Sequence, residues 1–170
     1  MERISTPGPP PTERQLIDLL RDTVRLTLPD GWESRVGESR QPPADAVLEL
    51  TAPDGRAARL SVEAKSIVNA RDVPVIANRL RAAGAGEPSD AMAVARYLSP
   101  RARESLAGAG MSYLDATGNL RLATTEPAVF LLREGADRDP WRTPDRPTSS
   151  LRGMPAARVV RALHPANGKR

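Results

Sequence analysis

Apolar residues occupy every second position in two segments near the middle of the chain. They are Ala46, Leu48 and Leu50 in the first segment and Leu60, Val62 and Ala64 in the second. Alternation with a period of two residues is typical of half-buried β-strands. The pattern therefore predicts two neighbouring antiparallel strands joined by a tight turn.

The short turn between these segments contains Pro53, Asp54 and Gly55. Proline presets φ for the first position of a turn, and aspartate suits the second position. Glycine supplies the left-handed residue that closes a three-residue hairpin loop. We therefore expect a three-residue loop at this point.

The length of this loop sets the register of the hairpin. Three loop residues pair Ala52 with Arg56, so the numbers of opposed residues sum to 108. Asp45 then lies directly across from Glu63, with both side chains on one face of the sheet. Lys65 shares that face, about 6 to 7 Å further along the strand. A loop of two residues would instead put Asp45 and Glu63 on opposite faces.

The rest of the chain alternates helical and strand patterns. We expect helices over residues 12–28, 73–83 and 99–110, and strands within residues 32–39, 91–98 and 112–133. Thr12 and Ser99 are suitable N-caps for the first and third helices. Helices that alternate with strands after an initial hairpin predict an α/β domain with a mixed sheet.

Composition divides the chain into segments. We expect a disordered Pro-rich start, a main domain, a polar linker and a basic helical tail, over residues 1–11, 12–135, 136–150 and 151–170. Residues 1–140 carry 18 basic and 20 acidic groups, whereas residues 141–170 carry 7 basic and 1 acidic group. The net charge of +4 therefore reflects the tail and says little about the main domain.

Several classes of protein are excluded by residues that are scarce or absent. The chain has no cysteine, which excludes disulfides and thiolate zinc sites and suits a cytoplasmic location. His164 is the only histidine, which excludes metal sites with several histidine ligands, and its place in the tail argues against a histidine-based triad. No segment approaches about 18 apolar residues, and we expect no membrane association.

The opposed carboxylates of the hairpin predict a cation between them. Like charges directly across a strand pair repel each other. Mg²⁺ is commonly held by one or two carboxylates, with waters and phosphate oxygens completing its shell. Lys65 is one of only two lysines among 25 cationic residues, and an ammonium reaches a phosphate as a compact charge. An ordinary solvated strand face explains such a Glu-x-Lys triplet equally simply, and both interpretations stay open.

The segment PADAVLELTAPDGRAARLSVEAKS resembles the PD-(D/E)xK motif of restriction-endonuclease-like nucleases, and the helix before the hairpin makes the layout most like archaeal Holliday-junction resolvases. The resemblance implies that Asp45 and Glu63 bind Mg²⁺ or Mn²⁺, with the carbonyl of Ala64 as an additional ligand. It implies that Lys65 positions or activates the water. Glu13 matches an extra acidic residue that many members carry on the leading helix.

The segment YLSPRARESLAGAGMSYLDATGNLRL is similar to one in actinobacterial regulators and type IV antitoxin-like proteins, where a nuclease-like domain precedes a winged helix. The basic tail resembles the first helix of that module, but the sequence stops seven residues later. The absence of the rest of the module suggests a shortened chain, a short paralogue or a module that a partner completes.

Other polar residues are weaker candidates. The candidates for DNA contacts are Arg96, Arg101, Arg103, Arg152, Arg158 and Arg161. Each of them also fits an ordinary solvent-exposed arginine without a function. Asn78 and Arg81 are candidates for the helix face next to Lys65. Asp115 and Asn119 suit either the edge of an active site or a turn with an Asx hydrogen bond.

Two functions follow as hypotheses. The first is a Mg²⁺-dependent nuclease that cuts DNA, and a homodimer suits it because double-strand cleavage usually needs two active sites. The second is a catalytically inactive, nuclease-like regulator or antitoxin-type protein that binds DNA.

Overall fold

The computed structural model describes residues 7–85 and 91–143 of the chain. The basic tail, with Arg152, Arg158 and Arg161, and the first six residues lie outside this described part. The chain divides into a unit that ends at Pro140 and a unit that begins at Trp141. The fold and the site below belong to the first unit.

The first unit has an α/β fold, as predicted. Its helices are α1 (Glu13–Thr27), α2 (Val73–Leu80) and α3 (Pro100–Gly108), with a short turn η1 (Ala70–Asp72) before α2 and a π-helical turn η2 (Arg81–Ala85) after it. Its strands are β1 (Glu33–Glu38), β2 (Ala46–Thr51), β3 (Ala57–Ile67), β4 (Ala91–Tyr97), β5 (Ser112–Asp115), β6 (Leu120–Thr125) and β7 (Ala128–Arg133). Among the described residues, no helix has the length and apolar character needed to span a membrane.

The strands form one mixed sheet within the described residues, and their order in space follows their order in the chain. Strands β1, β2 and β3 are antiparallel to one another. Strands β3, β4 and β5 run parallel, with α2 and α3 in the connections. Strands β6 and β7 return to antiparallel pairing. Both faces of the parallel centre therefore need a cover of helices.

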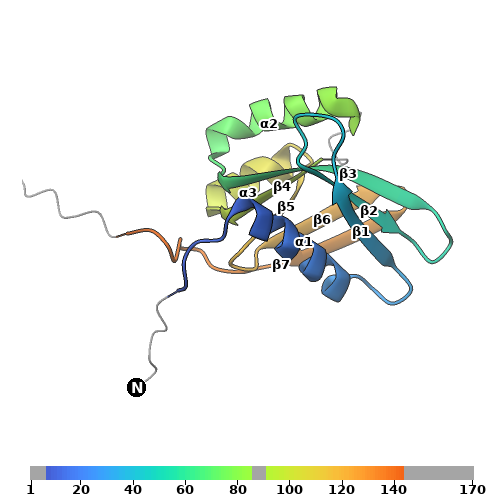
Figure 1. Ribbon diagram of the computed structural model, residues 1–170, viewed down its shortest axis with the longest axis horizontal. Helices are drawn as coiled ribbons and strands as arrows, with labels where there is room; N and C mark the ends of the chain where they lie inside the picture. The colour runs from blue at the N-terminus through green and yellow to red at the C-terminus, as the bar shows by residue number, and fades with distance from the viewer. Residues whose placement is uncertain (1–6, 86–90, 144–170) are drawn as a thin grey trace, which may run out of the picture. The chain divides into compact units, whose positions relative to one another are not determined.

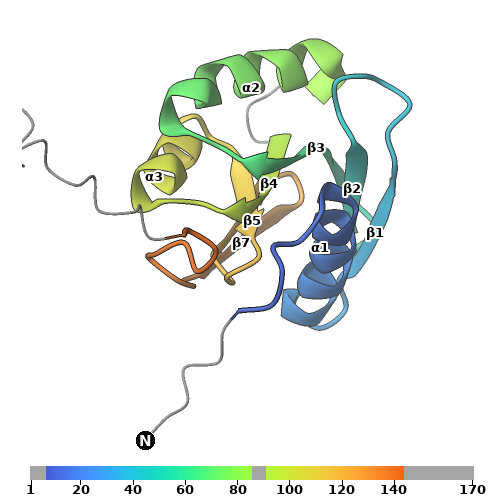
Figure 2. The same ribbon diagram turned by 60° about the vertical axis from the view of Figure 1, so that its left-hand side comes forward.

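Helices cover the two faces unequally (Figures 1 and 2). Helix α1 packs over the face that carries Leu60 and Val62, and α2 and α3 pack over the other face. Thr12 begins α1 in a capping box with Gln15, as the sequence predicts for this cap. Leu16 of α1 is completely buried, which stabilises the fold by about 1.5–3 kcal/mol.

The hairpin between β2 and β3 has the predicted loop and the predicted register. The backbone N–H of Ala52 donates to the carbonyl of Arg56 over 2.8 Å, and Gly55 adopts a φ of +86°. Ala46 pairs with Val62, so opposed residue numbers sum to 108 as expected. The positive φ explains the glycine, because other residues rarely adopt that conformation.

The side chain of Asp54 reinforces this loop. Its carboxylate accepts hydrogen bonds from the backbone N–H and the guanidinium of Arg56, over 3.0 and 2.8 Å. The backbone bond, followed by the side-chain bond, lowers the pKa of Asp54 below its usual value. The loop that sets the register is thus held by local hydrogen bonds as well as by proline and glycine.

The compact unit extends five residues beyond the predicted domain end at 135. Asp137 forms an ion pair with Arg103 over 2.7 Å, and Asp139 forms one with Arg96 over 3.0 Å. The amide of Asn119 also donates to the carbonyl of Ala136. Because these contacts fasten residues 136–139 to the body, the polar composition that predicted a linker here was misleading.

Candidate metal centre

Glu63 and Lys65 lie on the sheet face that α2 covers. Glu63 pairs with Ala93 of β4, which belongs to the core beneath α2 and α3. Paired residues of neighbouring strands share a face, and residues two apart on one strand share it too. Glu63 is only 5% exposed, and a buried acidic side chain on a strand needs partners for its charge.

Asp45 is fixed at the start of β2, directly before Ala46. Its backbone N–H donates to the carbonyl of Val62 over 2.8 Å. Its carboxylate oxygen Oδ2 accepts a hydrogen bond of 2.8 Å from the backbone N–H of Ala64. The pairing of β2 with β3 ends at Ala46 and Val62, and the bond from the Asp45 N–H to Val62 departs from the register by one residue. The structure thus holds Asp45 at the backbone of Ala64, the residue between Glu63 and Lys65.

The two oxygens of the Glu63 carboxylate differ in their contacts. Its oxygen Oε1 forms an ion pair with the ammonium of Lys65 over 3.1 Å and also contacts the guanidinium of Arg79 on α2. Its second oxygen, Oε2, is buried and has no hydrogen-bond partner among the described residues. Buried polar atoms almost always have a partner. An unpartnered buried oxygen, on a carboxylate whose other oxygen contacts two cations, is an unusual feature of this face.

Arg79 is a residue of this cluster that the sequence did not reveal. We predicted Asn78 and Arg81 for this role, but neither forms a hydrogen bond or an ion pair with Asp45, Glu63 or Lys65 in the described part of the chain. The apolar pattern of α2 did not show which arginine faces the cluster. The helix buries Val73, Ile76, Ala77 and Leu80. At 100° per residue, Arg79 and Arg81 lie on opposite edges of that buried stripe.

The donors at this face fit a hard divalent cation. Oxygen ligands are what Mg²⁺ prefers, and it keeps several waters when only one or two carboxylates bind it. No cluster of three or more His, Cys, Asp or Glu side chains suited to a metal occurs within residues 7–85 and 91–143, so Asp45 and Glu63 would be the acidic ligands. The N–H of Ala64 points toward Asp45. Because the carbonyl and the N–H of a strand residue point to the same neighbouring strand, the carbonyl of Ala64 faces that side as well.

Glu13 is not brought into this cluster. It is the first residue of α1, it is exposed, and α1 packs against the opposite face of the sheet. No hydrogen bond or ion pair joins it to Asp45, Glu63 or Lys65 in the described part of the chain. The catalytic role expected for Glu13 therefore receives no support from its position.

No family model, curated protein or solved structure matches this chain. The assignment of the site consequently rests on its geometry and chemistry. The resemblance to PD-(D/E)xK nucleases remains a prediction from the sequence.

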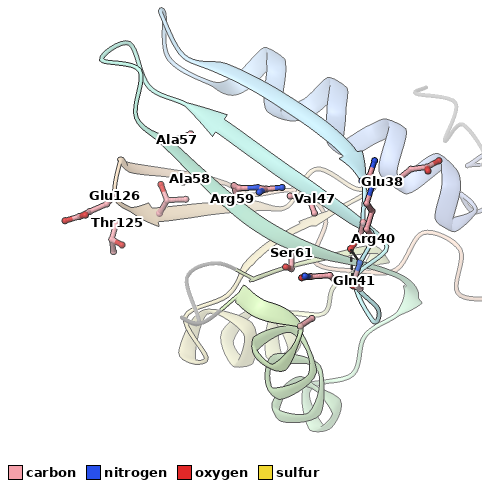
Figure 3. Close-up of a pocket in the computed structure, with 13 residues that line it drawn as sticks. Glu38, Arg40, Gln41, Val47, Ala57, Ala58, Arg59, Ser61, Thr125 and Glu126 are labelled. Carbon is pink, nitrogen blue, oxygen red and sulfur yellow. Dashed lines mark hydrogen bonds between the residues drawn. The ribbon is translucent and has the colours of Figure 1, made fainter.

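A polar groove lies on the same sheet face as the cluster, and Figure 3 shows the residues that line it. Its volume is about 680 Å³, and its walls include Arg59 and Ser61 of β3 and Gln41 of the β1–β2 loop. Figure 3 shows Glu38, Arg40 and Gln41 at one end and Thr125 and Glu126 at the other. Ser61 is two residues from Glu63 on one strand, which is about 6 to 7 Å. Asp45, Glu63 and Lys65 do not themselves line the groove, so Ser61 is its link to the carboxylates.

The three arginines of the main domain that we predicted to contact DNA differ in solvent exposure and in ion pairing. Arg96 and Arg103 are largely buried, and their ion pairs with Asp139 and Asp137 use their charges within the protein. Arg101 is exposed and lines a second cavity of about 690 Å³ together with Arg71. Of these three predicted residues, Arg101 is the one that solvent reaches freely.

Asp115 and Asn119 form a structural turn. The Asp115 carboxylate accepts from the backbone N–H groups of Leu98, Thr117 and Asn119, over 3.0, 2.9 and 3.1 Å. It also accepts from the hydroxyl of Thr117 and the amide of Asn119. Both Asp115 and Asn119 are buried. The Asx-turn interpretation is the one that these contacts support.

Proposed function

We propose that this protein is a nuclease that hydrolyses phosphodiester bonds of DNA with Mg²⁺ or Mn²⁺ held between Asp45 and Glu63. The observation that carries the proposal is the buried, unpartnered Oε2 of Glu63, with Lys65 on the same face and the carboxylate of Asp45 at the neighbouring Ala64. A cation is the partner that would complete this oxygen and offset the repulsion of the two carboxylates.

The chain supplies distinct roles to such a reaction. A bound divalent cation supplies an activated water and offsets the charge that develops on the phosphate. Asp45 is held in place by the N–H of Ala64, so it meets the cation in a fixed orientation. The ammonium of Lys65 forms an ion pair with Glu63, yet the side chain of Lys65 is 38% exposed. It can therefore turn toward a water or a phosphate oxygen without leaving the site.

The groove beside the cluster suits the approach of the substrate. Arg40 and Arg59 line it, together with hydroxyl and amide groups that bind phosphate and sugar oxygens. Arg59 is also within 3.6 Å of Glu49, which keeps the local charge moderate. We assign the protein to the cytoplasm as part of the same proposal, because the chain lacks cysteine and DNA is the proposed substrate.

A cleavage assay tests the proposal. We expect the purified chain to cut linear, branched or single-stranded DNA with Mg²⁺ or Mn²⁺ and to be inactive with EDTA. Lys65→Ala, Asp45→Asn and Glu63→Gln should each lower the rate at least about 100-fold. Glu33→Gln on β1 is the matched control for charge, because Glu33 is exposed, and it should keep full activity. Equal rates in all four variants would show that the cleavage comes from a contaminant or another site.

A second function is favoured by the two ion pairs of Glu63. The two cations at Oε1, Lys65 and Arg79, already balance the charges of Asp45 and Glu63, so the cluster holds together without a metal. This arrangement suits a nuclease-like protein that binds DNA as a regulator or antitoxin-type protein, alone as a homodimer or with a partner that supplies a winged helix.

Deletion of residues 141–170 separates the two functions. These residues carry a net charge of +6, and a regulator that relies on them should lose most of its DNA affinity and its steep salt dependence. A nuclease should keep its metal-dependent cleavage after the same deletion. Retained DNA affinity without any cleavage would contradict both expectations.

A further inference from the structure

We infer that Arg79 is the residue that the cation displaces, and that the displaced guanidinium then binds the phosphate of the substrate. This inference rests on the proposed function and adds a residue that the motif does not contain. Arg79 comes from α2, outside the hairpin, and contacts the carboxylate of Glu63.

The charges at the cluster support an exchange. Asp45 and Glu63 are balanced by Lys65 and Arg79, so the cluster has no net formal charge as it stands. Adding a divalent cation gives it two positive charges. A phosphodiester and a hydroxide each bring one negative charge and restore neutrality. The cluster is therefore matched to the reacting groups only when the cation, Lys65 and Arg79 are all present.

Competition follows from where the contacts are made. Arg79 and Lys65 share the single oxygen Oε1, while Oε2 remains without a partner. A guanidinium next to a carboxylate lowers its attraction for a second cation, because like charges repel. Metal binding to Glu63 must therefore weaken the contact with Arg79.

Arg79 is able to move once it is released. Its side chain is 43% exposed, although α2 itself is anchored by Val73, Ile76 and Leu80. A guanidinium presents two parallel N–H groups that match the oxygens of a phosphate. Lysine lacks that fork, so the two cations of the cluster are suited to different tasks: Lys65 to the water and Arg79 to the phosphate.

Calorimetry with Mn²⁺, in the absence of DNA, tests the competition. We expect Arg79→Ala to bind Mn²⁺ about tenfold more tightly than the unmodified chain, because the competing cation is gone. Arg79→Lys should give an intermediate affinity. Arg71→Ala is the matched control, since Arg71 is an exposed arginine just before α2, and its Mn²⁺ affinity should be unchanged. Thermal melts of all variants confirm that each is folded.

Cleavage kinetics test the phosphate contact. We expect Arg79→Ala to lower kcat/KM about 100-fold despite tighter metal binding, and Arg79→Lys to restore only part of it. A structural role would not combine tighter metal binding with slower cleavage.

The outcomes distinguish this inference from the proposed function. Metal-dependent cleavage by the unmodified chain, with Mn²⁺ affinity unchanged or weakened in Arg79→Ala, would overturn the inference and leave the proposed function standing. Mn²⁺ binding that appears only in Arg79→Ala would support the inference. Absence of Mn²⁺ binding and cleavage in every variant would overturn both.

Discussion

Two buried acidic residues of this domain, Asp115 and Glu63, have opposite surroundings. Asp115 is 1% exposed, and its two oxygens accept hydrogen bonds from Leu98, Thr117 and Asn119. Glu63 is 5% exposed, yet one of its oxygens has no partner among the described residues and the other is shared by two cations.

The difference shows how a structural carboxylate can be told from a candidate ligand. Burying an ionised carboxylate is unfavourable unless hydrogen bonds replace its lost water. The donors around Asp115 provide that replacement, so its environment is complete. Glu63 has charge compensation on one side only, which leaves room for another ligand. Burial alone therefore does not identify a functional acid; the unfilled bonding capacity does.

The largest expected effect is at Asp115. Asp115→Ala removes the acceptor for three backbone N–H groups, two of them buried and that of Thr117 half-buried, and unsatisfied buried donors cost about 1–3 kcal/mol each. We expect the free energy of unfolding in urea to fall by about 3–5 kcal/mol, with any cleavage of DNA affected only through the folded fraction. Asp18→Ala, at an exposed ion pair on α1, should change it by less than about 1 kcal/mol. A similarly small effect at Asp115 would remove the contrast between the two carboxylates.

The next effect concerns how tightly the Asp115 turn is packed. A Cβ atom at Gly135 would lie 2.5 Å from the carbonyl oxygen of Thr117 and 2.6 Å from the backbone nitrogen of Asn119. We expect Gly135→Ala to lower the free energy of unfolding by about 1–3 kcal/mol, as overpacking does. Gly108→Ala is the control, because a Cβ there meets nothing within 4 Å. Equal stability of the two variants would mean that the turn tolerates rearrangement.

The smallest effect on stability is expected at Glu63. Glu63→Gln keeps the shape of the side chain, and the partly exposed heads of Lys65 and Arg79 can be hydrated instead. We therefore expect the free energy of unfolding without metal to change by no more than about 1 kcal/mol. Unfolding in urea with EDTA measures it. A loss above about 3 kcal/mol would place Glu63 with Asp115, as a structural residue.

Local sequence was sufficient for the hairpin and for the shared face of its site residues. Pro53 and Gly55 favour one loop length, and that length sets the register as far as the pair of Ala46 and Val62, next to Asp45 and Glu63. The α/β fold followed from the alternation of helix and strand patterns, and it is confirmed.

Long-range placement was not contained in these local patterns. The rotation of α2 over the sheet decides whether Arg79 or Arg81 reaches β3, and its buried stripe is compatible with both. The ion pairs of Asp137 and Asp139 join residues more than 30 positions apart, so a polar segment that looks like a linker becomes part of the domain. The position of Glu13 on the other face likewise depends on how α1 packs.

The central claim is that the incomplete carboxylate of Glu63 marks a cation site, and the stabilisation of the folded state by Mn²⁺ tests it most directly. At a Mn²⁺ concentration 100-fold above the Kd from calorimetry, ligand linkage predicts a gain of about 2.7 kcal/mol in the free energy of unfolding. We expect this gain in the unmodified chain and in Gly108→Ala, and none in Glu63→Gln. An equal gain in Glu63→Gln, or none in the unmodified chain, would contradict the claim.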